Sequence, residues 1–155
     1  MTGERGEMKE LLEHLYFLTQ YLTEKDSETV TALCLMDLGF PANKQSFKYI
    51  KTAVILFKEK PDQLLVYELY PNVAKKFPMA AKTQVEIAIR REINRQWKNR
   101  DVRKWNMYFP NGITKRDTGP SNADFLSGMV QLLVLWEKCC KNYRKRVREQ
   151  LEEGT

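Results

Sequence analysis

Basic side chains crowd one fifth of the chain, between residues 75 and 104. This stretch holds ten Lys or Arg against three acids, a net charge of +7, whereas the whole 155-residue chain carries +6. A protein that binds DNA must neutralise phosphates, and Lys and Arg clustered along a helix supply that chemistry. The pattern therefore indicates double-stranded DNA as the partner.

Helical periodicity divides residues 82–98 into two faces. The apolar face, which we expect to pack on the core, consists of Val85, Ala88, Ile89, Ile93 and Trp97. The opposite face consists of Gln84, Ile87, Arg91, Asn94 and Lys98, with Arg90 and Arg95 on its flanks. In a major groove, Arg pairs with guanine, and Asn or Gln pairs with adenine. This helix is therefore expected to read DNA, and the alternative is a solvated basic face without a ligand.

Catalytic and metal-binding chemistry has little support in the sequence. His14 is the sole histidine, and no Ser, Cys or Asp stands at the spacing of a known catalytic triad. Cys34, Cys139 and Cys140 lack the paired spacing and the histidines of a zinc site, so they are expected to be structural thiols. We expect no enzyme activity, no bound metal and no cofactor.

Composition and charge fit one compact globular domain, with 43% apolar and 30% charged residues. No apolar run approaches the roughly 20 residues that a membrane span needs. The acidic, glycine-containing start at 1–8 lacks the pattern of a signal peptide. We expect a cytoplasmic protein with no membrane partner.

No segment alternates apolar and polar residues with a period of two, so the sequence predicts an all-α fold. Gly39 and Pro41 are expected to end the second helix. A helix over 63–70 is expected to kink or restart at Pro71 and to continue over 73–77. The other helices are expected at 8–23, 27–38, 44–59, 82–98, 101–109 and 122–151.

Five short motifs occur in order within residues 28–135. They are GFPA at 39–42, LYPNVAKKF at 69–77, VEIAIR at 85–90, Trp97, and PSNADF at 120–125. Together these motifs resemble the C-terminal DNA-binding effector domain of the stage-zero sporulation response regulator of endospore-forming Firmicutes. The resemblance covers about two thirds of the chain.

The resemblance implies an all-α, winged-helix-like effector domain of about six helices built on a helix–turn–helix. Residues 66–77 would form the positioning helix, and 82–98 would form the recognition helix that enters the major groove of sporulation promoters. The residues that would face bases or adjacent phosphates are Gln84, Glu86, Ile87, Arg90 and Arg91. The residues that would contact the DNA backbone are Lys75, Lys76 and Lys82.

Two positions depart from the family pattern. The family typically has arginine immediately before and after the Val85-Glu86 pair, where this chain has Gln84 and Ile87. A bidentate arginine–guanine pair supplies about 1–3 kcal/mol of discrimination, so without it we expect an altered target sequence. Ile87 would touch a thymine methyl or mark a protein-binding surface. The rival function is therefore a protein-interaction module that has lost base readout and acts on a full-length regulator or on RNA polymerase.

The two ends of the chain add segments to this effector domain. The expected division is an N-terminal helix at 1–27, the helix–turn–helix domain at 28–136, and a basic extension of the last helix at 137–155. The receiver domain of the family has no counterpart, so we expect regulation without phosphorylation of this chain. Residues 1–31 carry a net charge of −4 and residues 138–155 a net charge of +3. This contrast predicts pairing of the terminal helices, within one chain or in a homodimer; the alternative is simple extension of the core.

Overall fold

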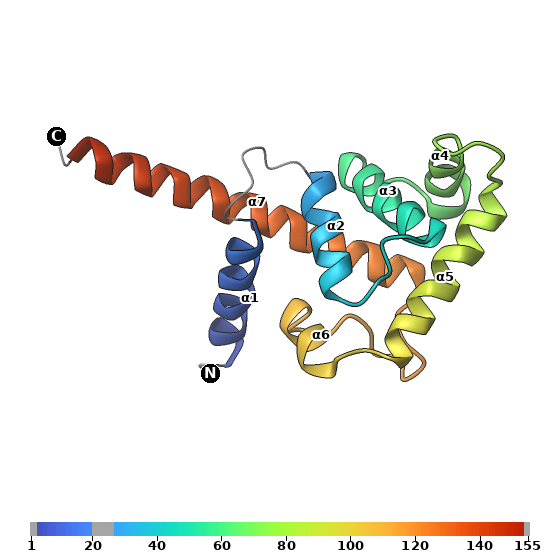
Figure 1. The fold of residues 1–155 in the computed structure, drawn as a ribbon, viewed down its shortest axis with the longest axis horizontal. Coiled ribbons are helices and arrows are strands. Elements are labelled where there is room, and N and C mark those ends of the chain that lie inside the picture. The colour runs from blue at the N-terminus through green and yellow to red at the C-terminus, as the bar shows by residue number, and fades with distance from the viewer. Residues whose placement is uncertain (1–2, 20–26, 154–155) are drawn as a thin grey trace.

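The structure, a computed structural model, describes the backbone of residues 3–19 and 27–153. Helices and turns make up this part of the chain, with no strand, and Figure 1 shows their arrangement. The all-α prediction is confirmed. The elements in order are α1 (Gly3–Thr19), α2 (Ser27–Asp37), α3 (Gln45–Glu59), the π-helical turn η1 (Leu65–Leu69), α4 (Tyr70–Ala74), α5 (Lys82–Lys98), α6 (Val102–Tyr108) and α7 (Asn122–Glu153).

The bounds of α5 match the predicted 82–98, and those of α2, α3, α6 and α7 lie within two residues of prediction. The prediction of 8–23 was wrong at its start, because α1 begins at Gly3, and residues 20–23 lie outside the described residues. An acidic, glycine-containing beginning did not prevent helix formation, since the apolar side chains that follow pack on the domain.

The segment around Pro71 restarts as a helix, but the predicted extents of 63–70 and 73–77 were wrong. The turn η1 begins at Leu65, and α4 ends at Ala74. Leu69 N–H donates to Leu64 O at 3.0 Å, a hydrogen bond across five residues that widens the turn. Pro71 has no N–H for an α-helical bond, so it is tolerated only near the start of a new helix, where it lies in α4.

Turn and cap residues fix both the end of α2 and the start of α7. Gly39 has φ of +106°, and the next residue, Phe40, donates its N–H to Leu35 O at 2.9 Å, which closes α2 as predicted. At α7, Ser121 Oγ accepts from Asp124 N–H at 3.1 Å, and an Asp124 carboxylate oxygen accepts from Ser121 N–H at 3.3 Å.

An aromatic cluster lies where α6 and α7 meet the loop after α2. Phe40, Trp105, Phe109 and Phe125 have ring centroids 5.2–6.2 Å apart, and Trp105 Nε1 donates to Leu38 O at 3.1 Å. All four rings are at most 8% exposed. These aromatic residues are therefore core anchors, and α3, α5 and α7 pack around the same core.

The terminal helix α1 packs on its own domain. Leu11 and Leu15 are buried in the common core, where α1 contacts α6 and α7. Figure 1 shows α1 at a steep angle to α7, with one end against it, and the last turns of α7 projecting beyond the other helices. Within the described residues, α1 therefore extends the core in the same chain. No helix in that part of the chain combines the length and apolar character of a membrane span.

Candidate nucleic-acid interface

The helix α5 lies on the domain by one face. Val85, Ile89 and Ile93 are fully buried, as the periodicity predicted, and Trp97 is partly buried against the core. Because three consecutive helical turns are anchored in this way, the opposite face is held in a fixed orientation toward solvent.

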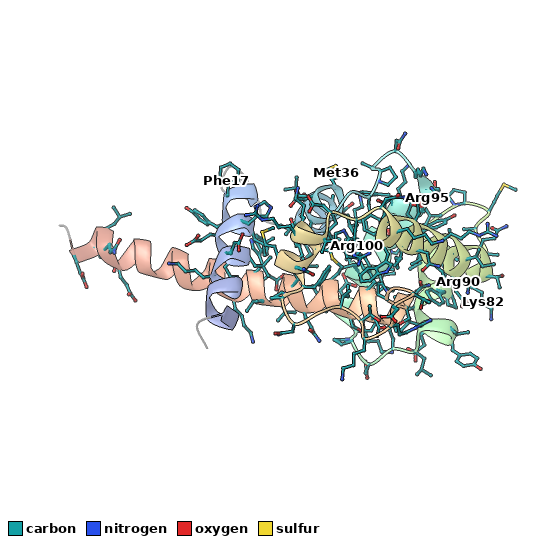
Figure 2. All side chains as sticks on the ribbon, turned by 90° about the horizontal axis from the view of Figure 1, so that it is seen from below. Phe17, Met36, Lys82, Arg90, Arg95 and Arg100 are labelled. Atoms are coloured by element: carbon teal, nitrogen blue, oxygen red, sulfur yellow. The ribbon has the colours of Figure 1, made fainter. Side chains whose placement is uncertain are left out.

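The outer face of α5 is open. Arg90 and Arg95 lie on opposite edges of the helix (Figure 2), and they retain 55% and 53% of their side-chain exposure. Glu86 and Ile87 are partly buried, so Ile87 is less prominent than the helical wheel suggested. The exposed members of the predicted site on α5 are Lys82, Gln84, Arg90, Arg91, Asn94, Arg95 and Lys98.

Three of the predicted base-facing residues also have partners within the protein. Gln84 Oε1 accepts from Ala81 N–H at 3.3 Å, which satisfies a backbone donor at the start of α5. The Glu86 carboxylate lies 3.9 Å from Arg90 Nη1. Gln84 therefore offers mainly its Nε2 donor to a ligand, and a ligand that takes Arg90 must compete with Glu86.

A buried carboxylate joins α5 to the start of α3. Glu92 is 2% exposed; its Oε1 accepts from Ser46 Oγ at 3.2 Å and lies 3.9 Å from Lys44 Nζ. Its Oε2 lies 3.2 Å from Arg95 Nη1. Sequence reasoning missed this contact, because Glu92 stands on the border of the apolar face and its partners on α3 are far away in the chain.

Lys75 and Lys76 are exposed just after α4. They line a cavity of about 450 Å³ together with Lys60 and Gln63, which follow α3. These two lysines thus precede the turn before α5 and are separate from the outer face that carries Arg91 and Asn94.

Two cations of the basic stretch serve the fold. The Arg100 guanidinium lies 3.6 Å from the ring centroid of Trp97 and donates to Trp97 O at 2.7 Å. Lys104 Nζ lies 3.0 Å from Asp37 Oδ1. The charge count alone therefore overstated the basic surface available to a ligand.

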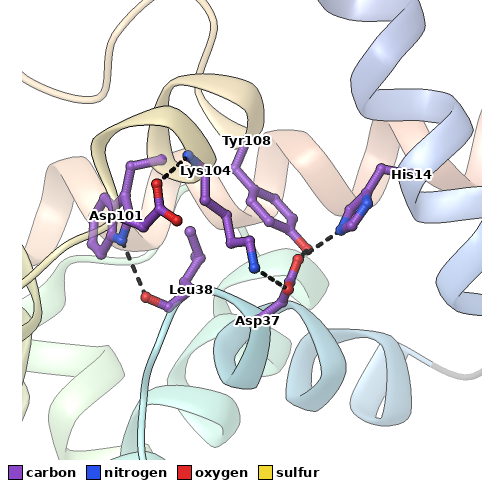
Figure 3. Close-up of polar contacts among 7 residues, drawn as sticks. His14, Asp37, Leu38, Asp101, Lys104 and Tyr108 are labelled. Carbon is purple, nitrogen blue, oxygen red and sulfur yellow. Dashed lines mark hydrogen bonds and ion pairs between the residues drawn. The ribbon is translucent and has the colours of Figure 1, made fainter.

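Asp37, at the end of α2, contacts polar side chains from two other helices, α1 and α6 (Figure 3). Its Oδ2 accepts from Tyr108 Oη at 2.5 Å and lies 2.7 Å from His14 Nε2. No spacing rule in the sequence could place this Asp partner of His14, because the fold joins two residues that are 23 positions apart. The contact connects α1 to α2.

The surroundings of Asp37 shift three acid groups. Burial alone would raise the pKa of Asp37, but hydrogen bonds from Tyr108, His14 and Lys104 outweigh it and hold that pKa below its ordinary value. Burial, helped by the charge of Asp37, raises the pKa of the Cys34 thiol to about 12. Burial also raises the pKa of Tyr108. Cys34 is thus an inert core thiol, as expected, whereas the side chains of Cys139 and Cys140 lie outside the described residues.

Comparison with known proteins bears on the part of the chain that carries α2 to α7. A family model described as "Sporulation initiation factor Spo0A C terminal" matches residues 30–133. No solved structure matches the chain. The matched range contains the motifs noted in the sequence and the whole of α5, and it spans well over half of the chain. The family is one of DNA-binding effector domains in sporulation control, a regulatory class and not an enzyme class. The chain therefore belongs to the Spo0A C-terminal family of sporulation initiation factors.

Proposed function

We propose that this chain is a sequence-specific transcriptional regulator that binds double-stranded promoter DNA with α5 in the major groove. The observation that carries the proposal is the open outer face of α5, where Arg91, Asn94 and Lys98 are exposed opposite the fully buried Val85 and Ile93. A helix about 10–12 Å across fits a major groove about 12 Å wide. Family membership supports the same function.

The chemistry of the side chains divides them into two roles. Arg90, Arg91 and Asn94 have hydrogen-bonding groups that suit base edges, and the two arginines can also neutralise adjacent phosphates. Gln84, whose oxygen is already bonded, would donate to a purine N7 or a carbonyl oxygen. The remaining cations suit backbone phosphates. Such contacts position the protein on the duplex but do not read its sequence. These cations are Lys75, Lys76, Lys82, Arg95 and Lys98.

The rival proposal is a protein-interaction module that acts on RNA polymerase or a full-length regulator. It is favoured by apolar side chains on η1 and just before it, where Tyr67 is 77% exposed, Leu64 59% and Val66 46%. Exposed groups of large apolar residues commonly mark protein-binding surfaces. The Glu86–Arg90 contact also favours it, because it occupies two residues proposed for base reading.

We also propose that the chain forms a homodimer whose interface is α7 and not α1. The helix α1 is already packed on its own domain, whereas Leu151, near the projecting end of α7, is 69% exposed. Light scattering on the full chain and on a Leu151→Lys variant measures the molar mass in solution. A parent dimer that becomes a monomer in the variant supports an interface through α7.

Binding of a labelled sporulation-promoter duplex and a random duplex tests the main proposal. We expect a preference for the promoter and an affinity that falls steeply between about 50 and 200 mM salt. Replacing Arg90 and Arg91 by Ala should reduce the slope of log affinity against log salt by about 0.9 for each phosphate that is no longer neutralised. Failure to bind either duplex in dilute salt, together with retention of RNA polymerase by the immobilised chain, would favour the rival.

A further inference from the structure

The loop between α6 and α7 is fixed against α5. Gly119 and Pro120 are buried, and Gly119 lies directly against the indole of Trp97. The loop is internally bonded as well: Gly119 N–H donates to Arg116 O at 3.2 Å, and Arg116 N–H donates to Thr114 Oγ1 at 3.0 Å. Arg116 is therefore presented by an ordered turn.

This turn and α5 enclose a cavity of about 370 Å³. Arg90 and Asn94 line it from α5, and Arg116 and Thr118 line it from the loop. Arg90, Asn94, Arg116 and Thr118 are all exposed, so the cavity opens to solvent. Two guanidinium groups from distant parts of the sequence thus border the same space.

The charges around this cavity favour an anion. Glu86, on its wall, is the only acid among its lining residues and lies 3.9 Å from Arg90 Nη1, so it offsets one of the two arginines. Arg116 and Thr118 both line the cavity from the loop. The exposed neighbours Lys115 and Asp117 offset each other, so Arg116 leaves a net positive charge on this side of the cavity. Guanidinium and hydroxyl groups are the donors that proteins commonly use to hold phosphate oxygens.

Groove geometry identifies the source of that phosphate. A helix about 10–12 Å across nearly fills a major groove about 12 Å wide, so elements beside the helix face the backbone that borders the groove. The turn that carries Arg116 lies beside α5 on the Arg90 edge.

We propose that Arg116, assisted by Thr118, is a second DNA contact that binds a backbone phosphate beside the one nearest Arg90. This inference rests on the proposed function. It deepens that function, because it makes the loop before α7 a clamp that fixes how α5 lies in the groove. The contact adds affinity on any sequence and no base discrimination.

The test compares Arg116→Ala with a control that removes the same charge elsewhere. Lys138 is exposed on α7, sixteen residues after Asn122, whose side chain donates to Glu86 O. That separation is about 24 Å along the helix, so Lys138 is remote from the start of α7, where α5 contacts it. Both variants change exposed side chains and should keep the helical circular dichroism of the parent.

The salt dependence of duplex binding is the measurement. Arg116→Ala should reduce the slope by about 0.9 on promoter and random duplexes alike, whereas Lys138→Ala should leave it unchanged. An Arg116→Ala slope equal to that of the parent, while Arg91→Ala lowers it, would overturn the clamp and leave the proposed function standing. Absence of duplex binding by the parent would overturn both.

A free anion is the other source of the same chemistry, and inorganic phosphate is the probe. Competition by phosphate should weaken duplex binding of the parent and of Arg116→Ala to the same degree, as a general salt effect. A thermal stabilisation by inorganic phosphate that Arg116→Ala abolishes, without any change in the duplex slope, would assign the cavity to a small anion and overturn the DNA contact.

Discussion

The ring of Trp97 lies so close to Gly119 that an added Cβ would come within 2.8 Å of Trp97 Cδ1. Trp97 belongs to the helix that is proposed to enter the DNA groove. Gly119 belongs to the loop that is proposed to bind a phosphate of the DNA backbone. The two proposed contact surfaces are therefore joined by direct packing. A change at Gly119 should affect both the stability of the domain and the placement of the loop.

Gly119→Ala should lower the free energy of unfolding by about 2–5 kcal/mol. A φ of +106° disfavours any side chain by about 1–2 kcal/mol, and overlap with a packed ring adds about 1–3 kcal/mol. Urea unfolding measures the decrease. Gly112→Ala is the matched control, because Gly112 also has a positive φ, +80°, but its added Cβ would meet nothing closer than 3.9 Å. Equal decreases in the two variants would show that contact with Trp97 is unimportant.

The helices and the two faces of α5 could be predicted because their signals are local. Apolar residues spaced along 82–98 indicated the buried face, and Gly39 and Pro41 indicated the end of a helix. The width of the turn η1 could not be predicted, because Pro71 allows either a kink or a restart. Tertiary packing decides between them.

Contacts between charged residues far apart in the chain were the main feature that could not be predicted from the sequence. Arg100 lies on Trp97 and Arg95 on Glu92, each three residues away, whereas Lys104 lies on the distant Asp37; all three cations also serve the fold. Asp37 and Lys104 are 67 positions apart in sequence, and no spacing rule connects them. For the same reason the loop with Arg116 was not among the predicted site residues, although the fold brings it to α5.

Leu15→Ala should destabilise the domain and leave DNA binding unchanged. Leu15 is fully buried, and such truncations cost about 2–5 kcal/mol. Figure 1 places α1 on the side of the domain remote from α5, so the salt slope of the folded variant should equal that of the parent. Phe17→Ala is the control on the same helix, because Phe17 is 65% exposed and its truncation should change stability by less than about 0.5 kcal/mol. A shallower salt slope of duplex binding in folded Leu15→Ala would instead show that α1 affects the DNA-binding surface.

Asp37→Asn should make the free energy of unfolding depend less on pH between about pH 7 and pH 3. The pKa of Asp37 is held below its ordinary value in the fold, so its ionised form stabilises the protein above about pH 4. That contribution disappears as pH falls through the lowered pKa. At neutral pH the variant should be less stable by about 2 kcal/mol, the scale of hydrogen bonds to a charged group. Urea midpoints measured from pH 7 down to about pH 3 should converge for the parent and variant. The exposed Asp62→Asn serves as control, and parallel profiles for the parent and Asp37→Asn would contradict the expectation.

Glu92→Gln should weaken the fold while strengthening non-specific DNA binding. Glu92 is buried and holds Arg95 at 3.2 Å and Lys44 at 3.9 Å, so the neutral amide forfeits charge-assisted interactions worth about 1–3 kcal/mol. The same change releases two cations beside α5, and each one that then binds a phosphate should steepen the salt slope by about 0.9. Ser46→Ala removes only the neutral donor to Glu92 and should cost less stability with no change in slope. A shallower salt slope for Glu92→Gln would contradict this expectation. It would mean that the Glu92 carboxylate holds Arg95 where it can bind a DNA phosphate, and that the neutral amide loses that contact.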